Sequence, residues 1–178
     1  MDIPPIDQAH TPLAYQDKGP PRYHRIVVKA GTSVLTRGRD TLDLSAMKGL
    51  VEQISSLHGR GIEMLLVTSG AIAAGRKPLG VTADHLPDIA FRQVLAAVGQ
   101  NHLMHTYSSM FEDQDITISQ VLLTRHDLAD EKHSANVHST LKALLSLGVV
   151  PIINENDAVA VDEIGEVFGD NDVLSALV

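Results

Sequence analysis

Residues 25–33 read RIVVKAGTS, and this stretch decides how the rest of the sequence is interpreted. A β-branched run ends in a lysine and is followed by glycine, threonine and serine. Short apolar runs bounded by glycine are typical of buried strands. In α/β proteins, ligands bind outside the carboxyl ends of such strands. We therefore interpret residues 25–29 as a strand that leads into a binding site.

The same pattern recurs along the chain. Further strands are predicted at 62–68, 116–123 and 149–153, and helical spacing of apolar residues is found at 44–57, 89–110, 133–147 and 173–177. Strands that alternate with helices predict an α/β fold with a mainly parallel sheet sandwiched between helices. Gly99 predicts a close contact between helices. Pro151 lies within a predicted strand, which argues for an edge position or a local irregularity.

Composition limits the classes of protein that fit. Aromatic residues make up 3% of the chain and hydrophobic residues 44%, so the core must be aliphatic. The absence of cysteine excludes disulfides, thiolate metal sites and thiol catalysis. A net charge of −8 without a basic cluster argues against nucleic acid and anionic membranes as partners. No membrane span or signal peptide is recognisable, and we expect a cytoplasmic protein.

Residues 1–22 differ from the rest of the chain. They hold five of the eight prolines and show almost no apolar periodicity, which predicts a flexible N-terminal arm. The folded domain is expected to span residues 23–178.

Four polar or small-residue segments fall at predicted strand ends or helix starts: 29–33, 68–71, 154–157 and 169–172. Gly31 and Gly70 allow close approach of a ligand to the backbone, and amides at a helix start attract anions. Ordinary tight turns would explain the same residues. Lys29 stands at the mouth of an apolar strand, where it can stabilise a transferring phosphoryl group. A surface lysine that extends to solvent is the alternative.

The two later segments carry carboxylates and amides together. Asp157 can face an ammonium group while neighbouring amides face a carboxylate, although an Asx-type turn fits the segment equally well. In the segment at 169–172, a role as the N-cap of the following helix would explain either Asp170 or Asn171, but only one of them. Two acids that flank Asn171 exceed what a cap requires, and they are weak support for a role in positioning lysines or a metal.

Common nucleotide-binding motifs are absent, as are paired zinc-ligand motifs. His102 and His105 share a helix face, which a solvated or packed pair explains better than a metal site. No metal-ligating residues are therefore predicted.

Six segments together resemble the amino acid kinase family in order and spacing: VVKAGTSVLT, VTSGAIAAGR, AAVGQ, QVLLTR, VVPIINENDAVA and FGDNDVLSAL. The resemblance runs from about Arg25 to the last residue. The NENDA and GDND-x-LSA blocks are similar to those members that phosphorylate the side-chain carboxylate of L-glutamate, the first step of proline synthesis.

The resemblance implies ATP and Mg²⁺ as cofactors and self-association of the full-length protein, and it makes proline a candidate feedback inhibitor. It also implies a role for each matching residue. Lys29 would contact the ATP phosphates and stabilise the transferring group, and Asp172 would organise the catalytic lysines with Asp170 nearby. Glutamate would be bound by Ser69, Asp157 and Asn171, and backbone amides would come from Gly31 and Gly70.

The last predicted helix stops at Val178 without a glycine cap. We therefore expect a substrate-binding part whose nucleotide-binding part is missing, inactive by itself. Two alternatives remain open. One is a related kinase for acetylglutamate or aspartate, and the other is a non-catalytic module that binds glutamate or proline.

Overall fold

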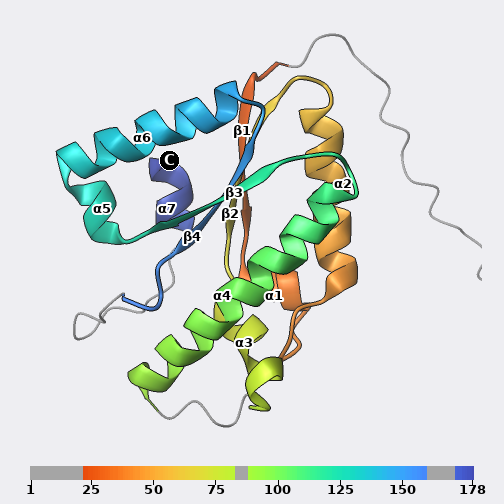
Figure 1. Ribbon diagram of the computed structural model, residues 1–178, viewed down its shortest axis with the longest axis vertical. Helices are drawn as coiled ribbons and strands as arrows, with labels where there is room; N and C mark the ends of the chain where they lie inside the picture. Colours follow the sequence, from red (N-terminus) through yellow and green to blue (C-terminus); the bar gives the residue numbers. More distant parts are fainter. Residues whose placement is uncertain (1–21, 83–87, 160–170) are drawn as a thin grey trace, which may run out of the picture.

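Four parallel strands form the centre of the molecule (Figure 1). The computed structural model describes residues 22–82, 88–159 and 171–178. The strands are β1 (Arg25–Ala30), β2 (Glu63–Thr68), β3 (Ile118–Leu123) and β4 (Val150–Glu155), in the spatial order β1-β2-β4-β3. Every described strand pair is parallel. The predicted α/β class with a parallel sheet is thereby confirmed.

Helices cover both faces of the sheet. They are α1 (Thr32–Thr36), α2 (Leu44–His58), α3 (Ala71–Leu79), α4 (Ile89–Glu112), α5 (Arg125–Ala129), α6 (Glu131–Ser146) and α7 (Asn171–Leu177). Figure 1 shows α2 and α4 on one side of the strands and α5, α6 and α7 on the other. The short helices α1 and α5 were not predicted, because five residues are too few to establish a helical period. None of the described helices is long and apolar enough to cross a membrane.

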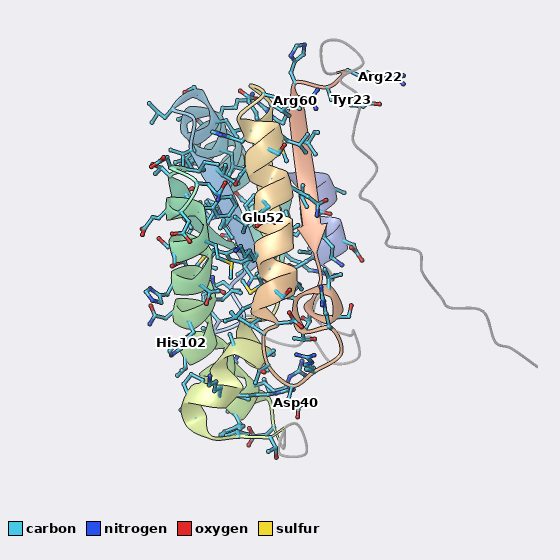
Figure 2. The ribbon with its side chains drawn as sticks, turned by 90° about the vertical axis from the view of Figure 1, so that its right-hand side faces the viewer. Arg22, Tyr23, Asp40, Glu52, Arg60 and His102 are labelled. Carbon is cyan, nitrogen blue, oxygen red and sulfur yellow. The ribbon has the colours of Figure 1, made fainter. Side chains whose placement is uncertain are left out.

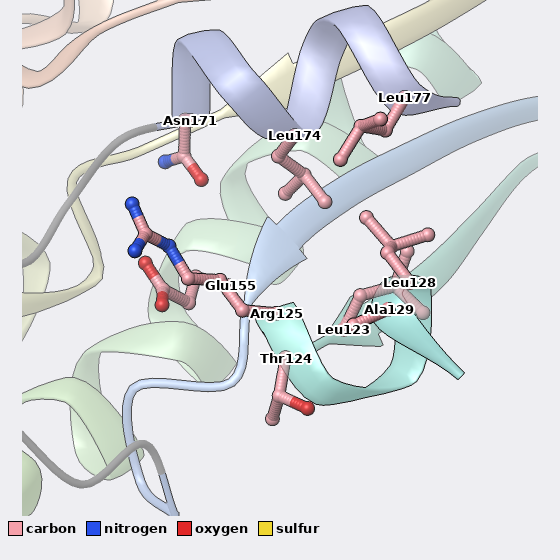
Figure 3. A pocket seen from close by; sticks show the side chains of 9 residues that line it. All are labelled: Leu123, Thr124, Arg125, Leu128, Ala129, Glu155, Asn171, Leu174 and Leu177. Carbon is pink, nitrogen blue, oxygen red and sulfur yellow. The ribbon is translucent and has the colours of Figure 1, made fainter. Parts of the chain in front are cut away.

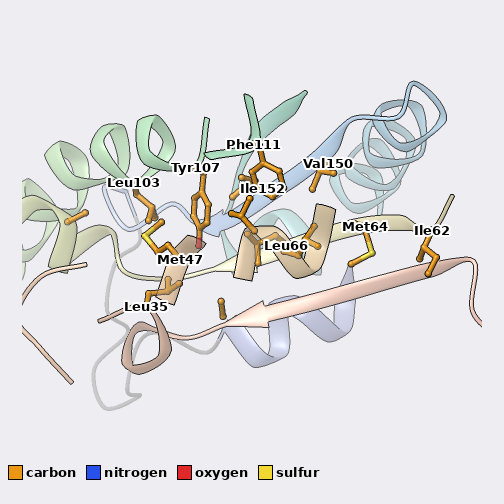
Figure 4. Packing of buried hydrophobic residues seen from close by; sticks show 14 residues of the cluster. Leu35, Met47, Ile62, Met64, Leu66, Leu103, Tyr107, Phe111, Val150 and Ile152 are labelled. Carbon is orange, nitrogen blue, oxygen red and sulfur yellow. The ribbon is translucent and has the colours of Figure 1, made fainter. Parts of the chain in front are cut away.

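Alternating side chains of the strands build two separate cores. In β2, Met64 and Leu66 point toward α2 and α4, whereas Leu65 and Val67 point toward α6 and α7. All four are at most 1% exposed. Figure 4 shows the first core, in which Tyr107 and Phe111 are the aromatic members. As predicted, both cores are otherwise aliphatic.

Pro151 is not in an edge strand, because β4 lies between β2 and β3. The expected irregularity is nevertheless present. The amides of Val150 and Asn156 donate to carbonyls of the β3 segment, so the odd-numbered positions of β4 face β2. The register between β2 and β4 begins only at Ile152, one residue after the proline. The missing N–H therefore falls where the ladder to β2 has not yet started.

Helices α3 and α4 approach each other through two glycines. A Cβ placed on Gly99 would overlap the carbonyl oxygen of Ala71 and the amide nitrogen of Gly75. A Cβ on Gly75 would overlap the backbone of Leu95. The predicted close contact at Gly99 is thus confirmed. This packing matters for the site because only the turn at Ser69 and Gly70 separates β2 from α3, so the position of α3 fixes the position of that turn.

We expect Gly99→Ala to destabilise the protein by at least about 2 kcal/mol, since overpacking forces backbone to move. Gly49→Ala is the matched control. Gly49 lies within α2, and a Cβ there would meet nothing within 4 Å. Alanine at that position should stabilise the protein by about 0.5–1 kcal/mol. Urea unfolding followed by circular dichroism measures both changes, and equal effects of the two substitutions would contradict the close packing.

Candidate functional site

The carboxyl ends of β1, β2 and β4 meet at one edge of the sheet, as parallel strands require. A polar hollow of about 450 Å³ lies there. Its wall includes four of the predicted site residues: Ser69, Gly70, Asp157 and Asn171. They come from three segments far apart in the sequence. The structure therefore brings them together, as the strand-end pattern predicted.

Asn171 ties these segments to one another. Its side-chain Nδ2 donates to the carbonyl oxygen of Thr68 at 2.8 Å and to Ser69 Oγ at 2.6 Å. Asn154 Oδ1 is a further, longer acceptor at 3.4 Å. Asn171 is 5% exposed, and its Oδ1 has no hydrogen-bond partner among the described residues. Because an unpaired buried acceptor is costly, this oxygen is suited to accept a hydrogen bond from a ligand.

Sequence reasoning missed the layer behind Asn171. Asn154 belongs to β4 rather than to the turn after it, and it is 1% exposed. Its Nδ2 donates to Gln100 Oε1 of α4 at 2.9 Å. Gln100 Nε2 is buried and lacks a partner in the described part of the chain. The AAVGQ segment contained Gln100, but a glutamine on a helix gives no signal that it faces a strand end.

Lys29 and Asp172 form a second group beside the hollow. Lys29 Nζ lies 2.8 Å from Asp172 Oδ1. In the register of β1 and β2, Lys29 is opposite Val67, next to the turn at Ser69. This contact is consistent with the role that the resemblance implies for Asp172, the positioning of lysines, which stays a prediction. Asp170, which was expected nearby, lies outside the described residues.

Gly31 leaves room for the ammonium group of Lys29. A Cβ on Gly31 would lie 3.2 Å from Lys29 Nζ, tighter than an ordinary contact. Lys29, Gly31 and Asp172 do not line the polar hollow itself, although Thr32 does. The predicted residues thus fall into two adjoining groups rather than one.

The turn after β2 presents backbone amides to the hollow. Gly70 precedes α3 with a φ of 94°, a left-handed conformation that glycine adopts readily. A Cβ at Gly70 would also lie 3.4 Å from a methyl group of Leu42. Helix α3 begins at Ala71, directly after this glycine. The backbone N–H groups of its first turn have no partner within the helix, so they favour the binding of an anion.

The hollow contains charges of both signs. Three arginines line it, Arg39, Arg76 and Arg92, together with the carboxylates of Glu155 and Asp157. Burial raises the pKa of the Asp157 carboxyl above its ordinary value, and the charge of Arg92 opposes this effect. A site of this composition suits a small ligand that is itself both cationic and anionic.

A buried hydrogen bond joins the end of β2 to α4. Thr68 Oγ1 lies 2.9 Å from Tyr107 OH, and both residues are fully buried. Burial raises the pKa of the Tyr107 hydroxyl to about 12, although the bond to Thr68 partly offsets it. The Tyr107 hydroxyl therefore stays protonated at neutral pH and holds the side chain of Thr68 in place. The backbone carbonyl of Thr68 is the group that accepts a hydrogen bond from Asn171.

An apolar hollow adjoins the polar one. It lies between α5 and α7 and is about 450 Å³ in volume. Figure 3 shows Leu128, Leu174 and Leu177 around it, with Arg125, Glu155 and Asn171 at its polar end. Glu155 and Asn171 line both hollows. Within the described ranges, no group of three or more His, Asp or Glu side chains is placed to hold a metal ion.

Comparison with known proteins identifies the relatives of this chain. The amino acid kinase family matches residues 24–178. The glutamate 5-kinase of Dehalococcoides mccartyi is 51% identical over 158 residues, which are 88% of this chain and 42% of that protein. The glutamate 5-kinases of Shewanella amazonensis and Herpetosiphon aurantiacus are 53% and 52% identical over 86% of this chain. The chain thus spans about two fifths of the length of these relatives.

The hydrogen bonds of Asn171 predict a large cost for its removal. Asn171→Ala leaves the Thr68 carbonyl and Ser69 hydroxyl without their donor, and we expect a loss of about 1–3 kcal/mol of unfolding free energy. Ser175→Ala, in the same helix, should cost less than about 0.5 kcal/mol because its hydroxyl bonds only to the nearby Asp172 carbonyl at the surface. Urea denaturation of both variants tests the difference, and a cost at Asn171 no greater than at Ser175 would contradict the bridging role.

Asp157→Asn should stabilise the protein at neutral pH. A carboxyl whose pKa is raised by burial binds its proton more tightly in the folded state, so the folded state loses stability as the pH rises above the unfolded value near 4. The asparagine variant avoids this loss. Its midpoint of thermal unfolding should exceed that of the parent at pH 7, and the advantage should vanish below about pH 4. The matched control is Asp115→Asn, outside the site, and an advantage independent of pH would disprove the linkage.

Proposed function

The chain belongs to the amino acid kinase family, and from this we propose that it forms the glutamate-binding part of a glutamate 5-kinase. Such an enzyme transfers the γ-phosphoryl group of ATP to the side-chain carboxylate of L-glutamate and yields L-glutamyl 5-phosphate, the first step of proline synthesis. Residues 23–178 would supply the substrate site. The relatives extend well beyond the matched length, and most of the nucleotide site would belong to that additional part.

The polar hollow carries this proposal. Glutamate at neutral pH has one ammonium group and two carboxylates, and the wall of the hollow offers partners of both signs. Ser69 and Asn171 would donate and accept hydrogen bonds, and Asp157 would face the ammonium group. The unpaired Oδ1 of Asn171 supports this assignment, because a ligand N–H would satisfy it.

The second group of residues would serve the phosphoryl transfer. ATP supplies the γ-phosphoryl group. Lys29 would neutralise charge on the transferring group, and Asp172 would hold the ammonium of Lys29 in place through their 2.8 Å contact. A side chain at Gly31 would crowd the ammonium group of Lys29, so this glycine keeps that group beside the backbone. Backbone amides at Gly31 and Gly70 would then be donors for phosphate or carboxylate oxygens.

The chemistry needs no general base. The substrate carboxylate is already ionised at neutral pH, so its oxygen attacks the γ-phosphorus directly. The new bond joins this oxygen to phosphorus, and the bond between phosphorus and the oxygen bridging to the β-phosphate breaks. The chain's contribution is alignment and charge neutralisation. Mg²⁺ is usually held by one or two carboxylates together with substrate phosphates, and we assign no residue of this chain to that ion.

We expect the chain to bind L-glutamate and to reject N-acetyl-L-glutamate by at least about tenfold in affinity, because acetylation removes the ammonium that Asp157 would bind. Isothermal titration calorimetry measures both affinities. Asp157→Asn should weaken L-glutamate binding by about tenfold or more, since a charge-assisted hydrogen bond is lost. Asp115→Asn makes the same chemical change outside the site and should leave the affinity unchanged.

Two results would count against the proposal. Tighter binding of N-acetyl-L-glutamate or L-aspartate would indicate a related kinase with another substrate. Failure of a folded chain, as judged by circular dichroism, to bind any of the three amino acids would remove the assignment of Ser69, Asp157 and Asn171 as a substrate site.

A further inference from the structure

Two opposite charges, those of Arg92 and Asp157, line the polar hollow without forming an ion pair with each other. Arg92 lies in the first turn of α4 and Asp157 follows β4, and both line the hollow. The charge of Arg92 lowers the pKa of Asp157, so the two groups are within electrostatic range. Among the described residues neither side chain has a partner of opposite charge within 4.0 Å. A gap wider than direct contact therefore separates them.

The other arginines of the hollow already have carboxylate partners. Arg39 Nη1 lies 3.4 Å from Asp43 Oδ2. Arg76 Nη1 lies 3.5 Å from Asp40 Oδ1 and donates to the Asp40 carbonyl at 3.3 Å. Of the three arginines, Arg92 is the one without an ionic partner in the described ranges. It is therefore the cation most available to an incoming anion.

We propose that Arg92 and Asp157 together hold the two charges on the substrate's α-carbon, with Arg92 binding the α-carboxylate and Asp157 the ammonium group. This inference rests on the proposed function and adds a residue to it. An α-amino acid carries both charges on one carbon, so it needs two opposite partners separated by the width of that group. A facing arginine and aspartate that do not touch each other offer this arrangement.

The pair also orients the substrate. With the α-carbon fixed between Arg92 and Asp157, the remaining carboxylate can extend along the hollow toward Gly70 and Thr32, which line its wall. Thr32 follows β1, the strand that carries Lys29. Arg92 would therefore determine specificity by selecting ligands with a free α-carboxylate and by placing the other carboxylate at the reacting end.

The test compares L-glutamate with L-isoglutamine, the α-amide of glutamate, which keeps the ammonium and the side-chain carboxylate. The parent chain should bind L-glutamate at least about tenfold more tightly, because the amide removes the charge that faces Arg92. In Arg92→Gln this preference should shrink to less than about threefold, mainly through weaker binding of L-glutamate. Arg92→Lys should restore part of it, since it keeps the charge.

Arg60→Gln is the matched control. Figure 2 shows Arg60 at the end of the molecule opposite to Asp40, whose partner Arg76 lines the hollow. Replacement of Arg60 should therefore leave the ligand preference of the parent unchanged. Because Arg92 is exposed, its replacement should not alter the far-ultraviolet circular dichroism spectrum. If isoglutamine binds the parent too weakly to measure, the affinity of Arg92→Gln for L-glutamate decides, and a change below threefold overturns the inference.

The outcomes separate this inference from the proposed function. If L-glutamate binds, Asp157→Asn weakens it and Arg92→Gln does not, the role of Arg92 is wrong while the glutamate site stands. If the folded parent binds neither ligand, the proposed function fails first, and the inference falls with it.

Discussion

The side-chain amide of Asn171 is the contact on which the arrangement of the site depends. It joins the start of α7 to the carboxyl end of β2 through the Thr68 carbonyl, and it reaches Asn154 of β4 through a longer bond. A parallel sheet leaves backbone carbonyls and polar side chains at its carboxyl edge, and these groups need partners once helices cover them. The side-chain amide of Asn171 provides a hydrogen-bond donor for acceptors at the ends of both β2 and β4. Its remaining oxygen is buried and has no partner in the described part of the chain, which is the feature that the proposed ligand contact of this residue uses.

Small residues allow the polar edge to be reached. Gly99 and Gly75 bring α3 and α4 so close that side chains there would overlap backbone. This contact lets Gln100, the residue after Gly99, reach Asn154 from α4. The close packing of α3 on α4 and the hydrogen bond between Gln100 and Asn154 therefore depend on each other. A larger residue at Gly99 would move α4 away and break the hydrogen bond that positions Asn154.

The sequence predicted the parts of the fold and site that depend on local pattern. Buried strands are continuous apolar runs that end in lysine, glycine or polar residues, so Lys29 and Ser69 could be found from position at a strand end and Asn171 from position at a helix start. Gln100 and Arg92 could not, because they lie on a helix whose apolar residues are spread around its circumference, and nothing in their spacing indicates which strand end they face. Pro151 left two possibilities open, an edge strand or a local irregularity, for a related reason. Its effect depends on which neighbouring strand its nitrogen faces, and that is decided by the register of β4 rather than by the sequence of β4.

Local and overall charge act differently in this molecule. The chain carries a net charge of −8, which by itself would repel a dicarboxylate and a nucleotide. Three arginines are nevertheless gathered around one hollow, and two of them are held there by aspartates outside the hollow wall, Asp40 and Asp43. Exposed charges farther apart than about 8–10 Å are largely screened at physiological ionic strength, so the nearby arginines dominate what a bound ligand experiences. Asp157 is partly buried, which makes its charge costly, and under the proposed function the ammonium group of glutamate would offset that cost. An excess of acids over the whole chain is therefore compatible with the proposed preference for an anionic amino acid at one site.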